Sequence, residues 1–357
     1  MSKFQNLRVV EIRRETVDSV SLLLEPASVD TFNFKAGQYL TLRTTIDGED
    51  LRRSYSLCSA PHEGVLRVAV KEVPGGKFST YANRVLAVGD VLESMLPDGR
   101  FTADLSSDVK NHLGFAAGSG ITPIISIIKD ILHSSDETKF ALFYVNKETS
   151  SIIFKDELAD LKDTYLERLQ IFNLLTREPV EIEMFGGRLD GDRFDRIFSE
   201  VLSPSSFDVS YLCGPEEMIM AGKESLLSSG MNESKIKFEL FTTSIPASED
   251  KHQTIDTSST SDEDVEVAIV LDGVTTTVNL KRTGKSILDA ALDAGLDAPF
   301  SCQGGVCCSC RCKITSGNVS MDLNYALEPD EIENGYVLAC QSHPVGDGPF
   351  VLDFDQP

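Results

Sequence analysis

The stretch CQGGVCCSC, residues 302–310, decides the fold of the end of this 357-residue chain. Cys302, Cys307 and Cys310 are separated by four and two residues, and Cys340 follows after a long gap. This is the spacing of the thiolates that hold a plant-type [2Fe-2S] cluster. Each iron needs two thiolates, so a tight loop carries three sulfurs and a distant strand end supplies the fourth. The sequence therefore predicts a [2Fe-2S] cluster on these four cysteines.

Other interpretations of the cysteines fit the sequence less well. Taking Cys308 or Cys312 as a ligand would give spacings of five or three residues, so both are expected to be spectators. Gly304 and Gly305 permit the positive φ that a tight wrap of the loop requires. A zinc site would favour two CxxC pairs or nearby histidines, and the sequence has neither there. Unrelated buried thiols are the alternative that needs no metal.

The segment around the cysteines, residues 263–357, is predicted to be a domain of its own. It begins with two runs typical of a β-hairpin, VEVAIVLDG and VTTTVNLK, and continues into a helical pattern, SILDAALDAG. This order predicts an α+β, β-grasp-like ferredoxin domain. Residues 244–262, which precede it, have almost no apolar side chains and are rich in Ser, Thr and Asp, which predicts a flexible linker.

Two further domains are predicted upstream. Residues 1–104 hold short alternating or β-branched runs between turn signals such as DG, PGG and PDG, a pattern typical of an antiparallel β-barrel. Residues 105–243 alternate apolar runs with longer helical patterns, which predicts βαβ units on a parallel sheet. The predicted fold class is multidomain: an antiparallel barrel, an α/β nucleotide-binding domain and an α+β ferredoxin domain.

The stretch from Cys302 to Asp355 resembles the ferredoxin domain of the reductase subunits of phenylacetyl-CoA epoxygenases, and the similarity runs along the whole chain. Steroid hydroxylase reductases share the same domain order. The resemblance implies that NADPH gives a hydride to FAD and that the cluster passes single electrons to a separate oxygenase. That partner would be a di-iron phenylacetyl-CoA epoxygenase or, alternatively, a Rieske or steroid hydroxylase. A non-catalytic, redox-sensing protein is the alternative from another class.

A strand of the predicted barrel carries Arg53, Ser54, Tyr55 and Ser56, which match the R-x-Y-S signature of the ferredoxin-NADP reductase superfamily. Alternate residues of a strand share a face, so the Arg53 guanidinium can hold the FAD pyrophosphate while the Tyr55 phenol packs on the isoalloxazine. The resemblance places Ser56 near the flavin N5. Taken alone, such a tetrapeptide would ordinarily be part of a plain strand.

A second flavin motif follows at the expected distance. Val70 and Lys71 end a strand, and Gly75, Gly76 and Ser79 lie in the sequence PGGKFS, which leads into a helix. Free amides at a helix N-terminus bind phosphate, and Ser79 is expected to cap this helix. The two motifs together predict FAD. Without the first motif, the two glycines would be read as a hairpin turn.

A glycine-rich turn directly follows the strand pattern HLGFAA, at the place where a dinucleotide pyrophosphate binds in α/β folds. It contains Gly118, Gly120, Thr122 and Pro123 in the sequence GSGITP, which opens a predicted helix. Pro123 occupies the sixth position, so the motif is not the Rossmann GxGxxG fingerprint. GSGITP resembles the superfamily's own motif, and we expect it to bind the nicotinamide cofactor.

Cys213 and Gly214, at the end of the strand pattern VSYL, resemble the superfamily's CGP element, which lines the nicotinamide pocket. Hydride moves directly from nicotinamide C4 to flavin N5, so no thiolate nucleophile is required. We therefore expect Cys213 to pack and position the ring, and assign it with Tyr55 and Ser56 to the hydride-transfer site. A buried spectator cysteine is the alternative. Phe241 is expected to be a core aromatic rather than a shield for the flavin.

Thr176 and Arg177 follow the strand pattern IFNLL, where this superfamily often places the groups that bind a 2′-phosphate. Lys147 is a second cation that could help. An acidic residue at the ribose would favour NADH, and Glu178 follows immediately. The sequence favours NADPH, with NADH as the less favoured cofactor.

Charge narrows the choice of partner. The chain carries 33 Lys and Arg against 56 Asp and Glu, a formal net charge of -23, so it lacks the general basic character of a nucleic-acid binder or a polybasic membrane anchor. From residue 263 onward there are 15 acidic and 5 basic residues. This end is expected to prefer a basic docking surface on its oxygenase partner.

Composition and motifs exclude several other classes. No HExxH, GxSxG or Walker pattern occurs, which leaves a hydrolase or an NTPase without support. No apolar run is long enough to span a membrane and the opening residues lack an apolar signal block, so the cytoplasm is the expected location. The charged clusters SEDK and EPDEIE are expected to be solvated.

Overall fold

The computed structural model describes residues 4–27, 32–241 and 264–356. The predicted linker, residues 244–262, lies outside the described residues. No helix in the described ranges is both long and apolar enough to cross a membrane.

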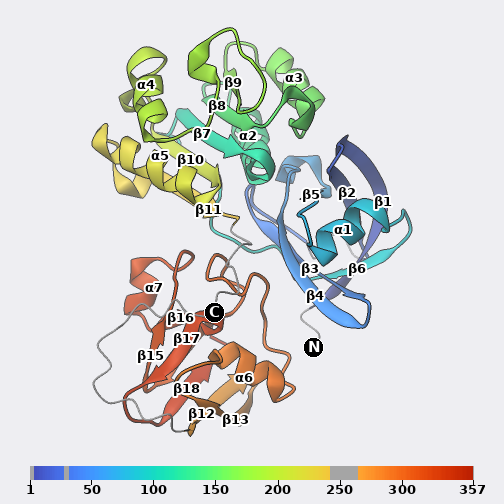
Figure 1. Cartoon of the computed structure of the whole chain (residues 1–357), viewed down its shortest axis with the longest axis vertical. Helices are drawn as coiled ribbons and strands as arrows, with labels where there is room; N and C mark the ends of the chain where they lie inside the picture. Colours follow the sequence, from blue (N-terminus) through green and yellow to red (C-terminus); the bar gives the residue numbers. More distant parts are fainter. Residues whose placement is uncertain (1–3, 28–31, 242–263, 357) are drawn as a thin grey trace. The chain divides into compact units, whose positions relative to one another are not determined.

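The first compact unit, Met1–Phe241, opens with a six-stranded antiparallel sheet in the order β4-β3-β6-β1-β2-β5 (Figure 1). A bridge between Leu57, which follows β4, and Val68 of β5 joins the two outer strands and closes the sheet into the predicted barrel. Its interior is apolar: Leu22 and Leu40, for example, are fully buried. The elements are β1 (Gln5–Thr16), β2 (Ser19–Pro26), β3 (Tyr39–Ile46), β4 (Glu49–Ser56), η2 (Pro61–Glu63), β5 (Leu66–Lys71), α1 (Lys77–Arg84) and β6 (Val91–Ser94).

A five-stranded sheet completes this unit. All its strands are parallel, in the order β11-β10-β7-β8-β9, which confirms the predicted α/β fold. The strands are β7 (Asn111–Ala117), β8 (Lys139–Asn146), β9 (Leu169–Leu175), β10 (Val209–Gly214) and β11 (Ile236–Leu240). The helices are η3 (Gly118–Gly120), α2 (Ile121–Ser134), η4 (Thr149–Ser151), α3 (Lys155–Thr164), η5 (Glu183–Phe185), α4 (Gly191–Glu200), η6 (Pro204–Ser206), α5 (Glu216–Ser228) and η7 (Glu233–Lys235).

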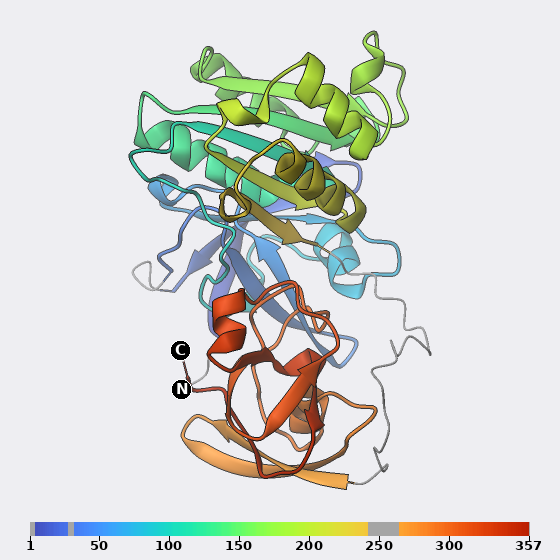
Figure 2. The same ribbon diagram turned by 90° about the vertical axis from the view of Figure 1, so that its left-hand side faces the viewer.

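Helices cover both faces of this sheet (Figures 1 and 2). On one face, the isoleucines of α2 pack with Tyr144 and Tyr211. On the other face, the ring centroid of Phe115 lies 4.9 Å from that of Phe194 in α4. Helix α4 was not predicted from the sequence. Its stretch is highly charged and buries only Phe194 and Ile197, so its apolar signal is weak.

The second compact unit, Thr242–Pro357, holds the cysteine loop and confirms the predicted α+β class. Its main sheet has the order β13-β12-β18-β14-β16, and β15 pairs with β17 separately. The β12–β13 hairpin is antiparallel, whereas β12 and β18 run parallel. The elements are β12 (Asp264–Leu271), β13 (Val274–Lys281), α6 (Ile287–Asp293), β14 (Arg311–Ser316), β15 (Asn318–Met321), α7 (Pro329–Glu333), β16 (Tyr336–Leu338), η8 (Ala339–Gln341), β17 (Ser342–Val345) and β18 (Phe350–Asp353).

Candidate functional site

The four cysteines predicted to hold the cluster converge in two pairs. Cys302, Cys307 and Cys310 lie between α6 and β14, and Cys340 lies in η8. The sulfurs of Cys302 and Cys307 are 3.1 Å apart, and the thiols of Cys310 and Cys340 hydrogen-bond to each other. Among the described residues, no three or more His, Cys, Asp or Glu side chains are grouped closely enough to surround a single metal ion. Two thiol pairs fit a binuclear cluster better than one tetrahedral ion.

The backbone of the loop brings these sulfurs inward. Gly305 has a φ of +72°, and a Cβ there would lie 2.9 Å from the Leu323 carbonyl oxygen, so only glycine fits. Gly304 was expected to share the positive φ, but Gln303 adopts it instead, at 53°. Hydrogen bonds from the Cys307 thiol and from backbone N–H groups lower the pKa of Cys302. This favours the thiolate, the form that binds iron.

The two remaining cysteines of this region belong to neither pair. Cys312 is fully buried in the apolar core of the unit, and burial raises the pKa of its thiol. The Cys308 thiol donates to the carbonyl oxygen of Ala326 at 3.3 Å. Both environments suit the spectator role predicted for these residues.

The acidic sequence EPDEIE is not simply a solvated face, which corrects the prediction. It forms α7, and Glu331 is only 7% exposed. Its carboxylate accepts a hydrogen bond from Arg311 at 2.5 Å. Arg311 directly follows Cys310, so this ion pair ties α7 to the end of the cluster loop.

The predicted flavin strand is β4, which pairs with β3 so that Arg53 faces Leu42 and Tyr55 faces Leu40. The Arg53 side chain is exposed and donates to the Arg52 carbonyl oxygen at 2.6 Å, so its guanidinium is accessible to an anion. The Tyr55 ring lies 5.4 Å from the ring of Phe78 in α1, and burial raises the pKa of its phenol. The contact brings the R-x-Y-S strand and the PGGKFS turn together.

The PGGKFS turn is built differently from the prediction in one respect. Ser79 does not cap α1: Gly76 holds the N-cap position, and Ser79 lies in the first turn. The Ser79 hydroxyl accepts from the Val73 amide and donates to the Gly76 carbonyl, both at 3.1 Å. A Cβ on Gly76 would lie 2.5 Å from this oxygen, and Gly75 has a φ of +77°. The serine therefore fixes the turn, and the first amides of α1 remain available to a phosphate.

The GSGITP turn lies where β7 and β10 meet, the point at which the strand order of the sheet reverses. Ligands of open α/β sheets bind at such a switch point. Gly120 approaches β10 so closely that a Cβ would lie 2.1 Å from the Cys213 carbonyl oxygen. Gly118 has a φ of +53° and its carbonyl accepts from Tyr144 at 3.0 Å. Thr122 and the buried Pro123 complete the first turn of α2.

Side chains from three strands form a polar cluster beside this turn. Cys213 and Glu239 are register partners on β10 and β11, and the Ser56 hydroxyl at the end of β4 donates to the Glu239 carboxyl at 3.2 Å. Burial raises the pKa of Glu239 to about 8, against the opposing effect of the Ser56 hydrogen bond. Burial, with Glu239 nearby, also raises the pKa of Cys213. Gly214 follows, and a Cβ there would lie 3.0 Å from Ala117.

The residues predicted to choose between nucleotides form a second group at the carboxyl ends of β8 and β9. The amides of Thr176 and Arg177 donate to the carbonyls of Asn146 and Lys147, both at 2.9 Å. Lys147 and Arg177 are exposed neighbours. The Glu178 carboxylate is engaged elsewhere: it accepts from the Thr149 amide at 2.7 Å and from the Thr149 hydroxyl at 3.0 Å.

Known protein families match each part of this arrangement. An oxidoreductase FAD-binding domain matches residues 7–103, an oxidoreductase NAD-binding domain 115–224, and a 2Fe-2S iron-sulfur cluster binding domain 269–345. One subunit of the 1,2-phenylacetyl-CoA epoxidase of Escherichia coli (strain K12) is 37% identical, over 99% of both chains. The chain belongs to the ferredoxin-NADP reductase superfamily.

One further relative agrees with this placement, and one solved structure shares the fold. The ferredoxin reductase component of the 3-ketosteroid-9-alpha-monooxygenase of Mycobacterium tuberculosis (strain CDC 1551 / Oshkosh) is 33% identical, over 96% of this chain and 93% of its own. A solved phthalate dioxygenase reductase has a TM-score of 0.60 and 23% identity, with 98% of both chains covered, and shares the fold.

A ferredoxin-NADP reductase of this domain composition is an oxidoreductase that uses FAD, a pyridine nucleotide and a [2Fe-2S] cluster. Features of this chain fit all three groups: paired thiols for the irons, an exposed Arg53 on the strand that contacts α1 through Tyr55 and Phe78 for FAD, and a glycine turn at the strand-order switch point for a dinucleotide.

Glu239 is the residue that sequence reasoning missed. Only Phe241 was considered in the sequence FELF, and it packs at the edge of the core as expected. The available signal was a carboxylate placed between two apolar residues, Phe238 and Leu240, near the end of a strand. Its partner Ser56 is 183 residues away in the sequence, so the fold is needed to see the pair.

Proposed function

We propose that this protein is the reductase component of a phenylacetyl-CoA epoxygenase, using NADPH to supply single electrons to a di-iron oxygenase partner. The observation that carries the reductase assignment is the hydrogen bond from Ser56, on the flavin strand, to Glu239, the register partner of Cys213 beside the nucleotide turn. It joins the two predicted cofactor sites at one point, as direct hydride transfer requires.

When bound, the three cofactors would convert a two-electron transfer into one-electron transfers, because the nicotinamide gives a hydride to FAD and the cluster carries single electrons. In this proposal the chain's own residues orient the FAD and the nicotinamide nucleotide. Arg53 would hold the FAD pyrophosphate, and Tyr55 would pack on the isoalloxazine. Ser56 and Glu239 hold one edge of the reaction site through their hydrogen bond, while the buried Cys213 excludes water from it.

Several proposed ligands act through backbone rather than side chains. Val70 and Lys71 end β5 beside the turn that Gly75, Gly76 and Ser79 form, and we assign this segment to the FAD phosphates. We assign the nicotinamide dinucleotide to the turn of Gly118, Gly120, Thr122 and Pro123 and to Cys213 and Gly214. We assign the irons to Cys302, Cys307, Cys310 and Cys340.

The choice of NADPH rests on the group at the ends of β8 and β9. Arg177 and Lys147 are exposed cations, and Thr176 adds a hydroxyl beside them. Glu178 would oppose a 2′-phosphate if it faced the ribose, but both of its oxygens accept hydrogen bonds from Thr149. Arg177 and Lys147 are therefore the groups that we expect a 2′-phosphate to meet, which favours NADPH over NADH.

The division of the chain is part of the same proposal. Residues 1–104 would bind FAD, 105–243 the nucleotide, and 263–357 the cluster, with 244–262 as a tether. A tethered ferredoxin domain has a high effective concentration for internal electron transfer and can still reach an acceptor. Its excess of acidic residues suits a basic surface on the oxygenase.

A second acceptor is favoured by the 33% identity to the ferredoxin reductase component of a 3-ketosteroid-9-alpha-monooxygenase. In that case the protein would serve a Rieske or steroid hydroxylase with the same internal chemistry. Purified oxygenases of both kinds, tested with the same reductase preparation, separate the two. Substrate turnover with the epoxygenase alone supports our proposal, and turnover with the hydroxylase alone transfers it to the second candidate.

The direct test is a spectrum and a rate on the anaerobically purified full chain. We expect flavin and [2Fe-2S] absorbance, bleached by NADPH at lower concentrations than by NADH, and steady reduction of ferricyanide. Rising salt should slow electron transfer to the oxygenase more than transfer to ferricyanide, because only the first involves docking of charged surfaces. A protein with full cofactor content that no nicotinamide nucleotide reduces would refute the reductase assignment and favour the redox-sensing alternative.

A further inference from the structure

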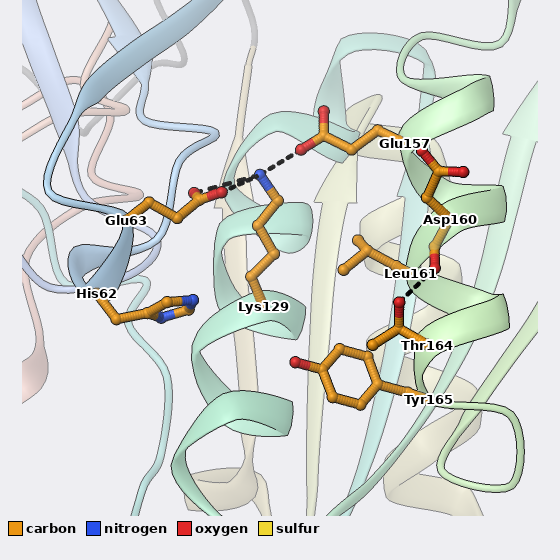
Figure 3. Close-up of a pocket in the computed structure, with 8 residues that line it drawn as sticks. All are labelled: His62, Glu63, Lys129, Glu157, Asp160, Leu161, Thr164 and Tyr165. Atoms are coloured by element: carbon orange, nitrogen blue, oxygen red, sulfur yellow. Dashed lines mark hydrogen bonds and ion pairs between the residues drawn. The ribbon is translucent and has the colours of Figure 1, made fainter.

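Lys129, on helix α2, is a buried charge to which the hydride-transfer site gives no role. Lys129 is only 7% exposed. The ammonium donates to the Cys58 carbonyl at 3.2 Å and lies 3.3 Å from both carboxylate oxygens of Glu63. It also pairs with the Glu157 carboxylate of α3. Figure 3 shows the lysine between these two carboxylates, which reach it from opposite sides.

The partners of Lys129 come from three separate parts of the Met1–Phe241 unit. Cys58 and Glu63 belong to the segment that leaves the flavin strand, since Cys58 is two residues beyond Ser56. Lys129 belongs to the helix that starts at the nucleotide turn, about eight residues and 12 Å earlier along its axis. Glu157 belongs to the next helix of the sheet. One ammonium therefore bonds the flavin-strand exit to two helices of the nucleotide-binding sheet.

A second contact from the same helix supports this connection. Ser126 is buried, and its hydroxyl donates to the Ser59 carbonyl at 2.6 Å. Ser126 and Lys129 are three residues apart, so they lie on the same side of α2. Their acceptors, the carbonyls of Ser59 and Cys58, are adjacent in the chain. Two hydrogen bonds from one helix to two successive carbonyls fix both the position and the direction of that segment.

The space beside Lys129 is not filled by apolar side chains. A cavity of about 180 Å³ opens there, lined by His62, Glu63, Lys129, Glu157, Asp160, Leu161, Thr164 and Tyr165 (Figure 3). Apolar contacts between the barrel and the sheet exist elsewhere, for example through Ala36 and Phe101. Such packing is non-directional, however, whereas the hydrogen bonds of Lys129 connect the barrel to the parallel sheet at defined angles.

Stability alone does not account for a buried cation at this place. Burial lowers the pKa of a lysine, but Glu157 and Glu63 outweigh this effect, and the pKa of Lys129 lies above its ordinary value. The ammonium is therefore charged at neutral pH. A buried ion pair is often no more stabilising than apolar side chains of the same volume. What the ion pair adds is a fixed geometry.

We propose that Lys129 is a positioning residue that holds the end of the flavin strand at a set distance from the nucleotide turn. Hydride transfer is sensitive to displacements of about 1 Å, which can lower a rate by about 100-fold. The proposal rests on the proposed hydride transfer from a nicotinamide nucleotide to FAD. It assigns Lys129 no contact with either cofactor.

The test uses the full-length holoprotein with the substitution Lys129→Met, which keeps the length of the side chain and removes its charge. We expect the limiting rate of flavin reduction by NADPH to fall by about 10-fold or more in a stopped-flow experiment. The apparent dissociation constant of NADPH should change by less than about threefold, because no nucleotide ligand is altered. An unchanged limiting rate, or a weaker affinity with an unchanged rate, would overturn the proposal.

Two further variants separate positioning from general stability. Glu63→Gln weakens the bond to the flavin-strand exit and Glu157→Gln the bond to α3, and both carboxylates are partly exposed, so both proteins should fold. We expect the larger loss of rate in Glu63→Gln. Lys110→Met removes an ion pair of 2.6 Å with Glu137 on the surface of the same sheet and should leave the rate unchanged. Equal losses in all three variants would indicate a stability effect and refute positioning.

Hydrogen exchange of the protein freed of FAD and nucleotide gives a readout independent of activity. Lys129→Met should speed exchange of the amides around residues 58–63 by about 10-fold, with little change in β1 and β2. If the unaltered protein failed to transfer hydride, the proposed function would fall while this comparison still decided the role of Lys129. Unchanged exchange at residues 58–63 would overturn it.

Discussion

The proposed cluster loop and the proposed hydride-transfer group of Ser56, Cys213 and Glu239 are assembled in opposite ways. Three of the four cluster cysteines lie within residues 302–310, and a glycine-dependent turn aims them inward. Ser56, Cys213 and Glu239 come instead from three strands of two sheets, and Ser56 and Glu239 are 183 residues apart. The first site is local, whereas the second exists only when the barrel and the parallel sheet are held together.

Because the two sites are assembled differently, substitutions at them should have different effects. Loss of a cluster ligand removes one cofactor and leaves the flavin–nucleotide unit intact, because the loop belongs to a separate compact unit. A change at the hydride-transfer group alters a distance or a protonation state rather than the presence of a cofactor. The variants below test that contrast, beginning with the largest expected effect.

Cys307→Ser should abolish the visible absorbance of the cluster, because the Cys302–Cys307 pair loses one of the two thiolates that one iron requires. Reduction of small dyes by NADPH should continue at close to its original rate through the flavin. Absorbance spectra and ferricyanide reduction measure the two effects. Cys308→Ser, in the same loop, is the control and should keep the cluster. Loss of ferricyanide reduction together with the cluster absorbance in Cys307→Ser would contradict the independence of the two sites.

Arg177→Ala should raise the KM for NADPH about 10- to 100-fold and the KM for NADH much less, since only NADPH carries the 2′-phosphate that the guanidinium would bind. Steady-state kinetics with both nucleotides provide the measurement. Glu178→Gln is a matched change at the next residue. Its carboxylate caps η4 through Thr149, so its loss should not reverse the preference. Parallel increases of both KM values in Arg177→Ala would reject the phosphate role.

The same contrast explains what the sequence could predict. Cysteine spacing and glycine turns are local signals, so the convergence of the four cysteines, the position of the GSGITP turn and the three fold classes could be predicted before the structure. The role of Glu239 could not, because it depends on the pairing of β10 with β11 and on the end of β4. Two local details also escaped. The hydroxyl of Ser79 fixes the turn before α1 instead of capping the helix, and Glu331 is buried because Arg311 pairs with it.

Glu239→Gln should change the pH dependence of stability. Burial raises the pKa of this carboxyl to about 8 in the folded protein, above its ordinary value of 4.5. Between these values the folded state binds one more proton than the unfolded state, so stability falls as pH rises, by at most about 1.4 kcal/mol per pH unit. Glutamine can still accept from Ser56 but has no proton to lose.

Denaturant unfolding of the holoprotein from pH 5.5 to 8.5, followed by flavin fluorescence, measures this effect. We expect the variant to lose less stability than the unaltered protein as the pH rises, and its limiting rate of flavin reduction to fall only a few-fold. Identical pH profiles for the two proteins would show that Glu239 does not hold a proton in the folded state.

Gln341→Leu is expected to have the smallest effect, because it alters the support of the cluster loop rather than a ligand. Gln341 is 7% exposed, and its amide donates to the Gln303 carbonyl at 2.9 Å, to the Cys340 carbonyl at 3.1 Å and to the Cys340 sulfur at 3.7 Å. It therefore connects the turn that carries the fourth cysteine to the residue after Cys302. Leucine keeps the volume and loses all three bonds, so the loop should open more often while the four thiols stay in place.

We expect the cluster absorbance of this variant to decay about two- to fivefold faster in the presence of an iron chelator, with an unchanged initial spectrum. Gln356→Leu is the matched control, since its exposed amide donates to Asp353 at 2.9 Å and lies outside the loop. Equal decay in Gln341→Leu and the unaltered protein would mean that the backbone turns at Gln303 and Gly305 hold the loop by themselves. The cluster site would then be local in its support as well as in its ligands, and its contrast with the hydride-transfer group would be sharper still.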